Sequence, residues 1–451
     1  MSLNRRDIIL GAAPLAAGAV LTAGTRDAQA KTPLGAVVDI TKFGLTPNAS
    51  SDQTSALQKC INFAAKNKLR LELPGGDYKT ASLILPSDLN FCGIGAQTRL
   101  LFIGGAAMLG AEKARNIILR DMAIIGRSKP FAGSGRRALI AMQDVSDLSI
   151  ENCTISDSIL NGITLRRCGG RVLNSTISKC GEAALFARDS IGLEIVQNHI
   201  EDCGNNGILV WRSKKGEDGT IVTQNRIQNI RAEAGGSGQN GNGINIFRAG
   251  SVLVTGNQIE DCTYSAVRDN GGDNVQILNN NCRRLGEVAL YAEFEFQGAI
   301  ISNNLVDDAH IGISITNFND GGRLATATGN LIRNIMKREG KVGTGLGVEA
   351  DTMVTGNVIE NVAGIGLALG YKAFMRHVAA NNNIIRNAEV GIGVTGNTKV
   401  GLAMIATNLI TGSKNGAIRA LDGNSPYGPD LAKESPESFP HLAIFGNIGL
   451  E

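Results

Sequence analysis

Apolar and polar residues alternate in short runs along most of the chain, in a pattern typical of β-strands. Examples are SVLVTGNQI at 251–259 and NGINIFRAG at 242–250, in which aliphatic residues alternate with small or polar ones. Successive side chains of a strand point to opposite faces, so such runs fit half-buried strands. Helical spacing is absent from these runs. The pattern therefore predicts many short strands separated by turns rich in Gly and Asn.

The runs recur with a period, which the hexapeptide NHIEDC at 198–203 and its near copy NQIEDC at 257–262 show most clearly. A period in the twenties is the signature of a solenoid, and strand-like units predict a parallel β-helix with one coil per period. We expect the Asn of each unit to stack in a line of turns, and the aliphatic residue two places later to point inward. Ser175 and Cys153 take the place of the Asn in two earlier units, and Asn447 follows the series after a longer interval. The series itself is Asn198, Asn225, Asn257, Asn280, Asn304, Asn330, Asn357, Asn383 and Asn408, at intervals of 23 to 32 residues.

Three of the eight cysteines share one place in the repeat. Cys180, Cys203 and Cys262 occupy a position that holds Ile230 and Leu285 in other units, so we expect buried, reduced thiols. Cys180 and Cys203 lie on adjacent coils and are the pair most able to oxidise. Cys203 and Cys262 are two coils apart, roughly 9.6 Å at the strand spacing, which is too far for a disulfide. A disulfide framework remains the alternative for an exported chain.

The N-terminus predicts export. Arg5 and Arg6 precede a Gly- and Ala-rich apolar stretch, and AQA stands before Lys31. These features resemble a twin-arginine signal over residues 1–30, with Asn4 where Ser or Thr is usual; an ordinary secretory signal is the alternative. The resemblance implies a periplasmic or secreted bacterial protein. No later run is long and apolar enough to span a bilayer. The net charge of +3 gives no reason to expect nucleic acid as a partner.

Residues 37–103 carry a different set of features. Ser51 or Asp52 can cap a helix whose apolar face holds Leu57, Ile61 and Ala64. Short strands and a turn follow this helix. The segment resembles the start of pectate-lyase-like proteins, and the motifs that carry the resemblance are Phe43–Gly44, Asp52, Leu73–Pro74–Gly75–Gly76, Tyr78 and Gly93–Gly95.

The resemblance implies an all-β solenoid, a right-handed parallel β-helix with an N-terminal capping α-helix. We expect a signal at 1–30, a cap and first coils at 31–105, β-helix repeats at 106–421, and a Pro-rich loop with a final strand at 422–451. Pectate-lyase-like proteins include lyases, hydrolases, epimerases, phage tailspikes and binding proteins, so the fold favours a polysaccharide partner and leaves the reaction open. The whole chain also resembles a family of twin-arginine-exported bacterial repeat proteins, which implies no activity.

One strand of each coil, the strand after the Asn turn, reads small–aliphatic–x–aliphatic–x, and its two x positions should face outward. Aromatic residues and arginines gather at the outward positions of the N-terminal coils, and glutamates at those of the C-terminal coils. Two Gly-rich insertions, 232–243 and 337–345, precede this strand in their coils and could line a cleft. The first outward position holds Thr164, Phe186, Leu209, Asn245, Arg268, Tyr291, Ser314 and Gly347. The second holds Arg166, Arg188, Trp211, Phe247, Asn270, Glu293, Thr316 and Glu349.

Rings beside arginines and carboxylates suit a sugar or uronate chain. As a hydrolase, the protein would use Glu293 and Glu349 as its pair of carboxylates. As a lyase, it would use Arg268 beside a uronate and Tyr291 as an acid. The alternatives are a non-catalytic glycan-binding or envelope-structural protein, and a solvated sheet face without a site. The expected substrate-binding residues are Trp211, Phe247, Arg248, Asn245 and Asn270.

Cofactor chemistry has little support in the sequence. The four histidines fall at scattered places of the repeat and predict no metal cluster. The run DNGGD at 269–273 has oxygen ligands suited to Ca²⁺ but is more typical of a turn. We therefore expect no cofactor, with Ca²⁺ at 269–273 as the open alternative.

Overall fold

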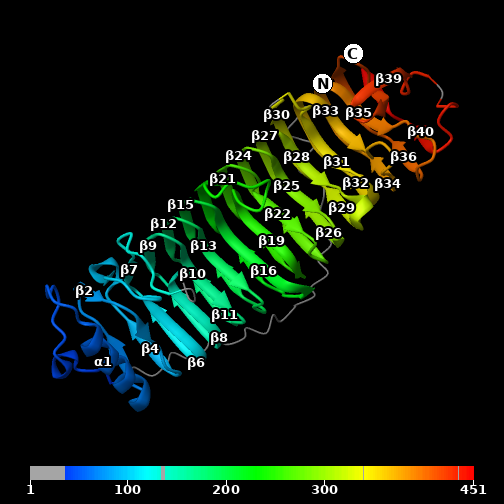
Figure 1. The fold of residues 1–451 in the computed structure, drawn as a ribbon. Coiled ribbons are helices and arrows are strands. Elements are labelled where there is room, and N and C mark those ends of the chain that lie inside the picture. Colours follow the sequence, from blue (N-terminus) through cyan, green and yellow to red (C-terminus); the bar gives the residue numbers. More distant parts are fainter. Residues whose placement is uncertain (1–35, 134–137, 339, 435, 451) are drawn as a thin grey trace, which may run out of the picture. The chain divides into compact units, whose positions relative to one another are not determined.

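The computed structural model describes residues 36–133, 138–338, 340–434 and 436–450 (Figure 1). The chain divides into two compact units, Met1–Ala36 and Val37–Glu451, and the second contains every helix and strand described below. The predicted export signal lies outside the described residues. No described helix has the length and apolar character that crossing a membrane requires.

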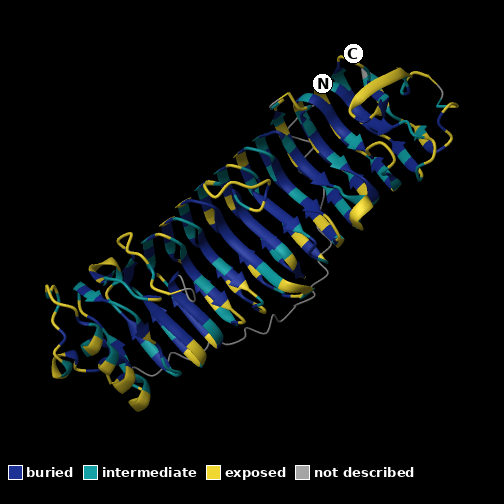
Figure 2. Ribbon diagram, viewed as in Figure 1, coloured by how far each residue is buried: buried dark blue, intermediate teal, exposed yellow. Residues whose placement is uncertain are grey.

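Residues 37–451 form a parallel solenoid, as the repeat predicts. Each strand pairs in parallel with the corresponding strand of the next coil, and three such series of strands run along the molecule. The antiparallel pair of β38 (Ile418–Asp422) and β39 (Ser425–Asp430) departs from this pattern. Strands are mostly buried, and exposed residues concentrate at turns and on the N-terminal helix (Figure 2).

The asparagine sheet is the series whose strands follow the repeated Asn. It buries the aliphatic residue two places after each Asn, as the sequence predicts. Its strands are β2 (Gly76–Thr80), β5 (Thr98–Phe102), β7 (Ala123–Ile125), β9 (Thr154–Ser158), β12 (Thr176–Cys180), β15 (His199–Cys203), β18 (Arg226–Ile230), β21 (Gln258–Cys262), β24 (Asn281–Leu285), β27 (Leu305–Ala309), β30 (Leu331–Ile335), the first parts of β33 (Val358–Leu369) and β35 (Ile384–Thr395), β37 (Leu409–Ser413) and β41 (Ile448–Leu450).

The aromatic sheet is the series that carries Phe186, Trp211 and Phe247. It comprises β3 (Leu83–Ile84), the first parts of β6 (Leu109–Arg120) and β8 (Ala138–Glu151), β10 (Asn161–Arg166), β13 (Ala183–Arg188), β16 (Asn206–Glu217), β19 (Asn242–Gly250), β22 (Val267–Asn270), β25 (Val288–Glu293), β28 (Ile311–Ile315), β31 (Thr344–Val348), the second parts of β33 and β35, and β38.

The third sheet completes each coil. It comprises β1 (Arg70–Glu72), β4 (Leu89–Cys92), the second parts of β6 and β8, β11 (Gly170–Leu173), β14 (Glu194–Val196), β17 (Ile221–Thr223), β20 (Leu253–Thr255), β23 (Val275–Leu278), β26 (Gln297–Ser302), β29 (Arg323–Thr328), β32 (Ala350–Thr355), β34 (Arg376–Asn381), β36 (Ala403–Ala406) and β40 (Leu442–Phe445).

The capping helix predicted near the N-terminus is α1 (Thr54–Asn67). It buries Leu57, Ile61 and Ala64, the predicted apolar face, and Asp52 accepts a hydrogen bond from the Thr54 N–H at 2.8 Å. The helix packs on the first coils of the solenoid, which otherwise would present open strand edges. Three short 3₁₀ helices complete the secondary structure: η1 (Ile40–Phe43), η2 (Gly95–Gln97) and η3 (Phe318–Asp320).

The repeated Asn residues form the predicted line. Oδ1 of Asn225 accepts hydrogen bonds from the backbone N–H and the Nδ2 of Asn198, at 2.9 and 3.0 Å, while Nδ2 of Asn225 donates to the carbonyl of Ile195 at 2.9 Å. The same contacts repeat from coil to coil as far as Asn447. Ser175 continues the line in the other direction by accepting from the Cys153 N–H. Buried amides are thereby satisfied on each turn.

The cysteines behave as small core residues. All eight lie in described parts of the chain, are buried and are unpaired. Cys180 pairs in register with Cys203, and Ile230 separates Cys203 from Cys262, as expected. Burial raises the pKa of Cys262 to about 12.

Candidate functional site

The outward positions of the aromatic sheet align as predicted. In one column Leu209 pairs with Asn245, and in the other Trp211 pairs with Phe247. Arg268 pairs with Tyr291 in the next coils. Because parallel pairing keeps equal positions side by side, the two columns are continuous rows of side chains across neighbouring coils.

Three aromatic rings, called the aromatic stack below, contact one another along the N-terminal part of these rows, one pair edge-to-face at 79° and the other tilted at 52°. The ring centroids of Phe186 and Trp211 are 5.3 Å apart, and those of Trp211 and Phe247 are 5.4 Å apart. The guanidinium of Arg248 lies 4.8 Å from the centroid of Phe247. Trp211 is half-buried, so one part of its ring is held by its neighbours while another part stays accessible.

A hollow of about 770 Å³ opens beside the stack. Phe186 and Trp211 line it together with the guanidinium groups of Arg166 and Arg188. Arg188 donates hydrogen bonds to the Ser213 hydroxyl, whereas the Arg166 side chain makes no hydrogen bond or ion pair to any described residue. The hollow is large enough for sugar units and combines apolar faces with polar groups, as ligand sites commonly do.

The first Gly-rich insertion borders this hollow. It joins β18 to β19, and Asn240 from it lines the hollow. Asn245, a predicted substrate-binding residue, donates from Nδ2 to the carbonyl of Gln239 in the same insertion at 3.2 Å. The insertion is therefore held against the aromatic sheet by side chains of that sheet.

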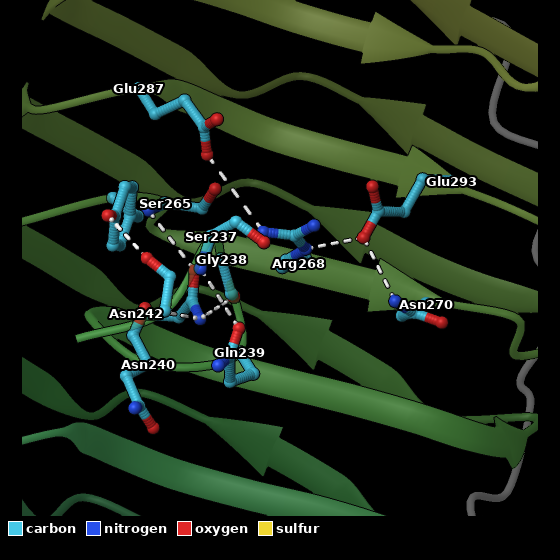
Figure 3. Close-up of polar contacts among 12 residues, drawn as sticks. Ser237, Gly238, Gln239, Asn240, Asn242, Ser265, Arg268, Asn270, Glu287 and Glu293 are labelled. Atoms are coloured by element: carbon cyan, nitrogen blue, oxygen red, sulfur yellow. Dashed lines mark hydrogen bonds and ion pairs between the residues drawn. The ribbon is translucent and has the colours of Figure 1, made fainter. Parts of the chain in front are cut away.

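Arg268 lies under the insertion and is bound to a carboxylate. Its Nε donates to Oε1 of Glu293 at 2.5 Å, and Nδ2 of Asn270 donates to the same oxygen at 3.0 Å (Figure 3). Glu293 is 1% exposed and Arg268 is 8% exposed. The ring of Tyr291 lies against this guanidinium, with its centroid 5.3 Å from Cζ of Arg268. Burial raises the pKa of the Tyr291 hydroxyl. Arg268, Asn270, Tyr291 and Glu293 thus form one contact cluster.

Glu287 approaches the same guanidinium from the other side, and no pattern in the sequence singles it out as a site residue. Its Oε2 is 3.9 Å from Nη1 of Arg268, and burial raises the pKa of the carboxyl. Glu287 precedes β25, at the turn into the aromatic sheet, outside the two outward columns. Glu287 lies two residues after the buried Leu285, in a turn of the repeat. Residues in such turns are ordinarily solvated.

Glu349 belongs to a second hollow, of about 460 Å³. Its Oε2 accepts the backbone N–H of Phe318 in η3 at 2.7 Å, and burial raises the pKa of the carboxyl. Ser314 and His310 also line this hollow, as does Lys341 from the second insertion. Both predicted insertions therefore border a hollow on the same sheet.

Comparison with known proteins agrees with this architecture. A family model described as "Right handed beta helix region" matches residues 138–217. The family 28 exopolygalacturonase of Yersinia enterocolitica superposes with a TM-score of 0.54 over 86% of this chain and 79% of that chain, at 14% identity. The N-terminal fragment of gene product 12 from bacteriophage phi29 superposes with a TM-score of 0.56 over 92% of this chain and 72% of that chain, also at 14% identity.

The chain has a right-handed parallel β-helix fold. An exo-poly-α-D-galacturonosidase of Dickeya chrysanthemi is 22% identical over 322 residues, a match that covers 61% of this chain and 51% of that protein. The chain thus spans about half the length of this curated relative. The predicted right-handed parallel β-helix is confirmed, and identities this low establish the fold alone.

Within this β-helix the predicted catalytic residues fall into two separate groups. Glu293 is held by Arg268 and Asn270, and Glu349 by η3. Arg268, expected to hold a substrate carboxylate, has its Nε occupied by Glu293. Trp211, Phe247 and Arg248 are brought together, as their shared position indicates. The catalytic and binding roles of all these residues stay predictions.

The run at 269–273 comprises the last two residues of β22 and the bend that follows this strand. Oδ1 of Asp269 accepts the Gly272 N–H at 2.9 Å, and the whole side chain is buried in the core between Ile246 and Ala292 of the adjacent coils. Burial raises the pKa of Asp269 well above its usual range. Among the described residues, no group of three or more His, Cys, Asp or Glu is placed to hold a metal ion.

Proposed function

We propose that the protein is exported and acts on a polysaccharide that lies along the aromatic sheet. The observation that carries the proposal is the stack of Phe186, Trp211 and Phe247 beside a hollow of about 770 Å³. Sugar rings present apolar C–H faces that pack on aromatic rings, while their hydroxyls need polar partners. The names of the relatives, two of which are polygalacturonan-cleaving enzymes, support a glycan as the ligand.

Arg166, which lines this hollow together with Arg188, Glu112 and Glu182, is the cation available to an acidic glycan at the aromatic stack. Arg166 is exposed and its guanidinium is unpaired among the described residues, so it can bind a carboxylate without first breaking an ion pair. A bidentate arginine–carboxylate contact supplies both charge and orientation. An acidic unit would thus place its ring on Trp211 and its carboxylate on Arg166.

Of the predicted catalytic residues, Glu349 is the best candidate for the general acid in bond cleavage. A general acid in glycoside hydrolysis must hold its proton near neutral pH, and burial raises the pKa of Glu349 in the required direction. The residue also lines a hollow, so a leaving-group oxygen can approach it. In the hydrolase proposal Glu293 is the second carboxylate; in the lyase proposal Arg268 and Tyr291 act on a uronate.

Non-catalytic glycan binding is the second proposal, and the Arg268–Glu293 ion pair favours it. Glu293 is 1% exposed and its Oε1 accepts hydrogen bonds from both Arg268 and Asn270, so a water has little access to this carboxylate. The hydrolase proposal therefore requires a rearrangement at Glu293 that the binding proposal does not.

Binding and cleavage can be tested in turn. Polysaccharides, including polygalacturonate, are titrated calorimetrically into the folded chain and into Trp211→Ala, with Phe445→Ala, an exposed ring on the third sheet, as the matched control. We expect Trp211→Ala to weaken binding at least tenfold and Phe445→Ala to bind normally. Product analysis then compares the wild type with Glu349→Gln. Loss of turnover with retained binding supports the enzyme; no product from any bound glycan supports the binding protein.

A further inference from the structure

The guanidinium of Arg268 donates a hydrogen bond to Glu293 on one side and makes no hydrogen bond within the described chain on the other side. Nε is occupied, but Nη1 is buried and makes no hydrogen bond to any described residue. The nearest carboxylate oxygen recorded on this side is Oε2 of Glu287, 3.9 Å away, and it too is buried without a hydrogen bond to a described residue. Figure 3 shows the two glutamates on opposite sides of Arg268.

The distance of 3.9 Å between Nη1 and Oε2 is too long for a direct hydrogen bond, but it suits a single bridging oxygen that hydrogen-bonds to both atoms. An oxygen about 2.8 Å from each atom can accept from Nη1 and donate to Oε2, with an angle of about 88° between the two contacts. A hydroxyl group can do both because it has one O–H and two lone pairs. A carboxylate can only accept, so it satisfies Nη1 and leaves Oε2 unsatisfied.

The backbone of Gly238 covers a third side of the Arg268 guanidinium. A Cβ placed on this glycine would lie 1.5 Å from Nη1 of Arg268, and its φ of +131° is one that residues with side chains rarely adopt. The first insertion therefore passes directly against the guanidinium, as Figure 3 shows, and a glycine is required where it does so. The backbone at Gly238 thus limits where the guanidinium can lie, and Nη1 stays 3.9 Å from Oε2 of Glu287.

Charge favours a neutral ligand at this point. Glu293 already compensates the charge of Arg268, and Glu287 adds a second carboxyl on the far side. An anion placed here would lie beside two carboxyl groups and the guanidinium of Arg268, with Lys341 as a further cation that acts on Glu287, and this balance does not favour an anion in a buried setting. The site thus differs from the aromatic hollow, where Arg166 is unpaired.

We propose that Nη1 of Arg268 and Oε2 of Glu287 together bind one neutral hydroxyl of the glycan. This inference rests on the proposed function, because it assigns the hydroxyl to a sugar that continues along the aromatic sheet from the Trp211 stack. The pair is a binding site for a neutral unit and replaces the expectation that Arg268 holds a substrate carboxylate.

The first test is a crystal structure of the full chain at a resolution that shows ordered solvent. We expect one oxygen within hydrogen-bond distance of both Nη1 of Arg268 and Oε2 of Glu287, from solvent in the free protein and from a sugar hydroxyl after soaking with oligosaccharide. A direct contact of about 2.8 Å between the two side chains would overturn the proposal. This outcome does not depend on which glycan binds.

The second test measures affinity with hexagalacturonate and cellohexaose as probes. Glu287→Ala should weaken whichever hexasaccharide binds about tenfold, and Glu287→Gln, which keeps an acceptor oxygen, should weaken it less. Glu389→Ala, a glutamate that instead contacts Asn415, is the control. Unchanged affinity in Glu287→Ala, with binding lost in Trp211→Ala, would reject the hydroxyl site and leave the proposed function standing. Full affinity in Trp211→Ala would reject the proposed function.

Discussion

Arg268 and Glu293 form a buried ion pair between adjacent coils, with Nε of Arg268 2.5 Å from Oε1 of Glu293. Both residues face outward from the aromatic sheet, yet both are almost fully covered. Removing Glu293 leaves the buried guanidinium with the more distant carboxyl of Glu287, 3.9 Å away. We expect Glu293→Ala to lower the free energy of unfolding by about 3–5 kcal/mol in urea denaturation.

An exposed pair of the same kind provides the control. Glu360→Ala, which breaks the exposed pair with Arg386, should change the free energy of unfolding by about 0–1 kcal/mol. Equal effects of the two substitutions would show that the Arg268–Glu293 pair is solvated in solution.

The line of asparagines should contribute strongly to stability. Asn257→Ala removes an acceptor for the N–H and Nδ2 of Asn225, both buried, and a donor to the Val222 carbonyl. Unsatisfied buried groups cost about 1–3 kcal/mol each, so we expect a loss of roughly 2–5 kcal/mol. The neighbouring exposed Gln258→Ala is the control. A loss below 1 kcal/mol for Asn257→Ala would contradict the role given to the line.

Asp269 should make stability depend on pH. Burial raises its pKa in the folded chain above the unfolded value near 3.8, so the folded state holds the proton more tightly. Its contribution is fully present below pH 3.8 and is lost as pH rises towards the folded pKa, because ionisation then favours unfolding. We expect Asp269→Asn to gain stability relative to the wild type as pH increases. Denaturation at a series of pH values measures this difference, and parallel curves would reject the assignment.

The buried thiols should be unreactive. Cys180, Cys203 and Cys262 lie in the core, and burial raises the pKa of Cys262 to about 12, so almost no thiolate forms at neutral pH. Iodoacetamide should label them only after unfolding, as peptide mass spectrometry can show. A Cys203–Cys262 disulfide in the native protein would contradict the coil register.

Periodicity made the fold predictable. Asn198 and its counterparts recur once per coil, and parallel pairing turns equal sequence positions into neighbours, so the line of Asn and the outward columns follow from counting. The shared core place of Cys203 and Ile230 was predictable for the same reason.

The contacts of the long side chains were not predictable in this way. Arg268 can reach Glu293 or Glu287, and the choice depends on the Gly238 backbone of an insertion that does not follow the repeat. Glu349 binds the Phe318 N–H in η3, another departure from the repeat. For Asp269 the sequence did carry a signal, because it stands in a place where adjacent coils have Ile246 and Ala292.

The fluorescence of Trp211, the single tryptophan of the chain, can show directly whether a polysaccharide lies on the aromatic sheet. All tryptophan emission therefore reports on the aromatic stack. Titration with a glycan that binds by calorimetry should shift or quench this emission with the same dissociation constant, and Phe445→Ala should behave alike. A glycan that binds by calorimetry and leaves the emission of Trp211 unchanged would show that the polysaccharide does not lie on the aromatic sheet.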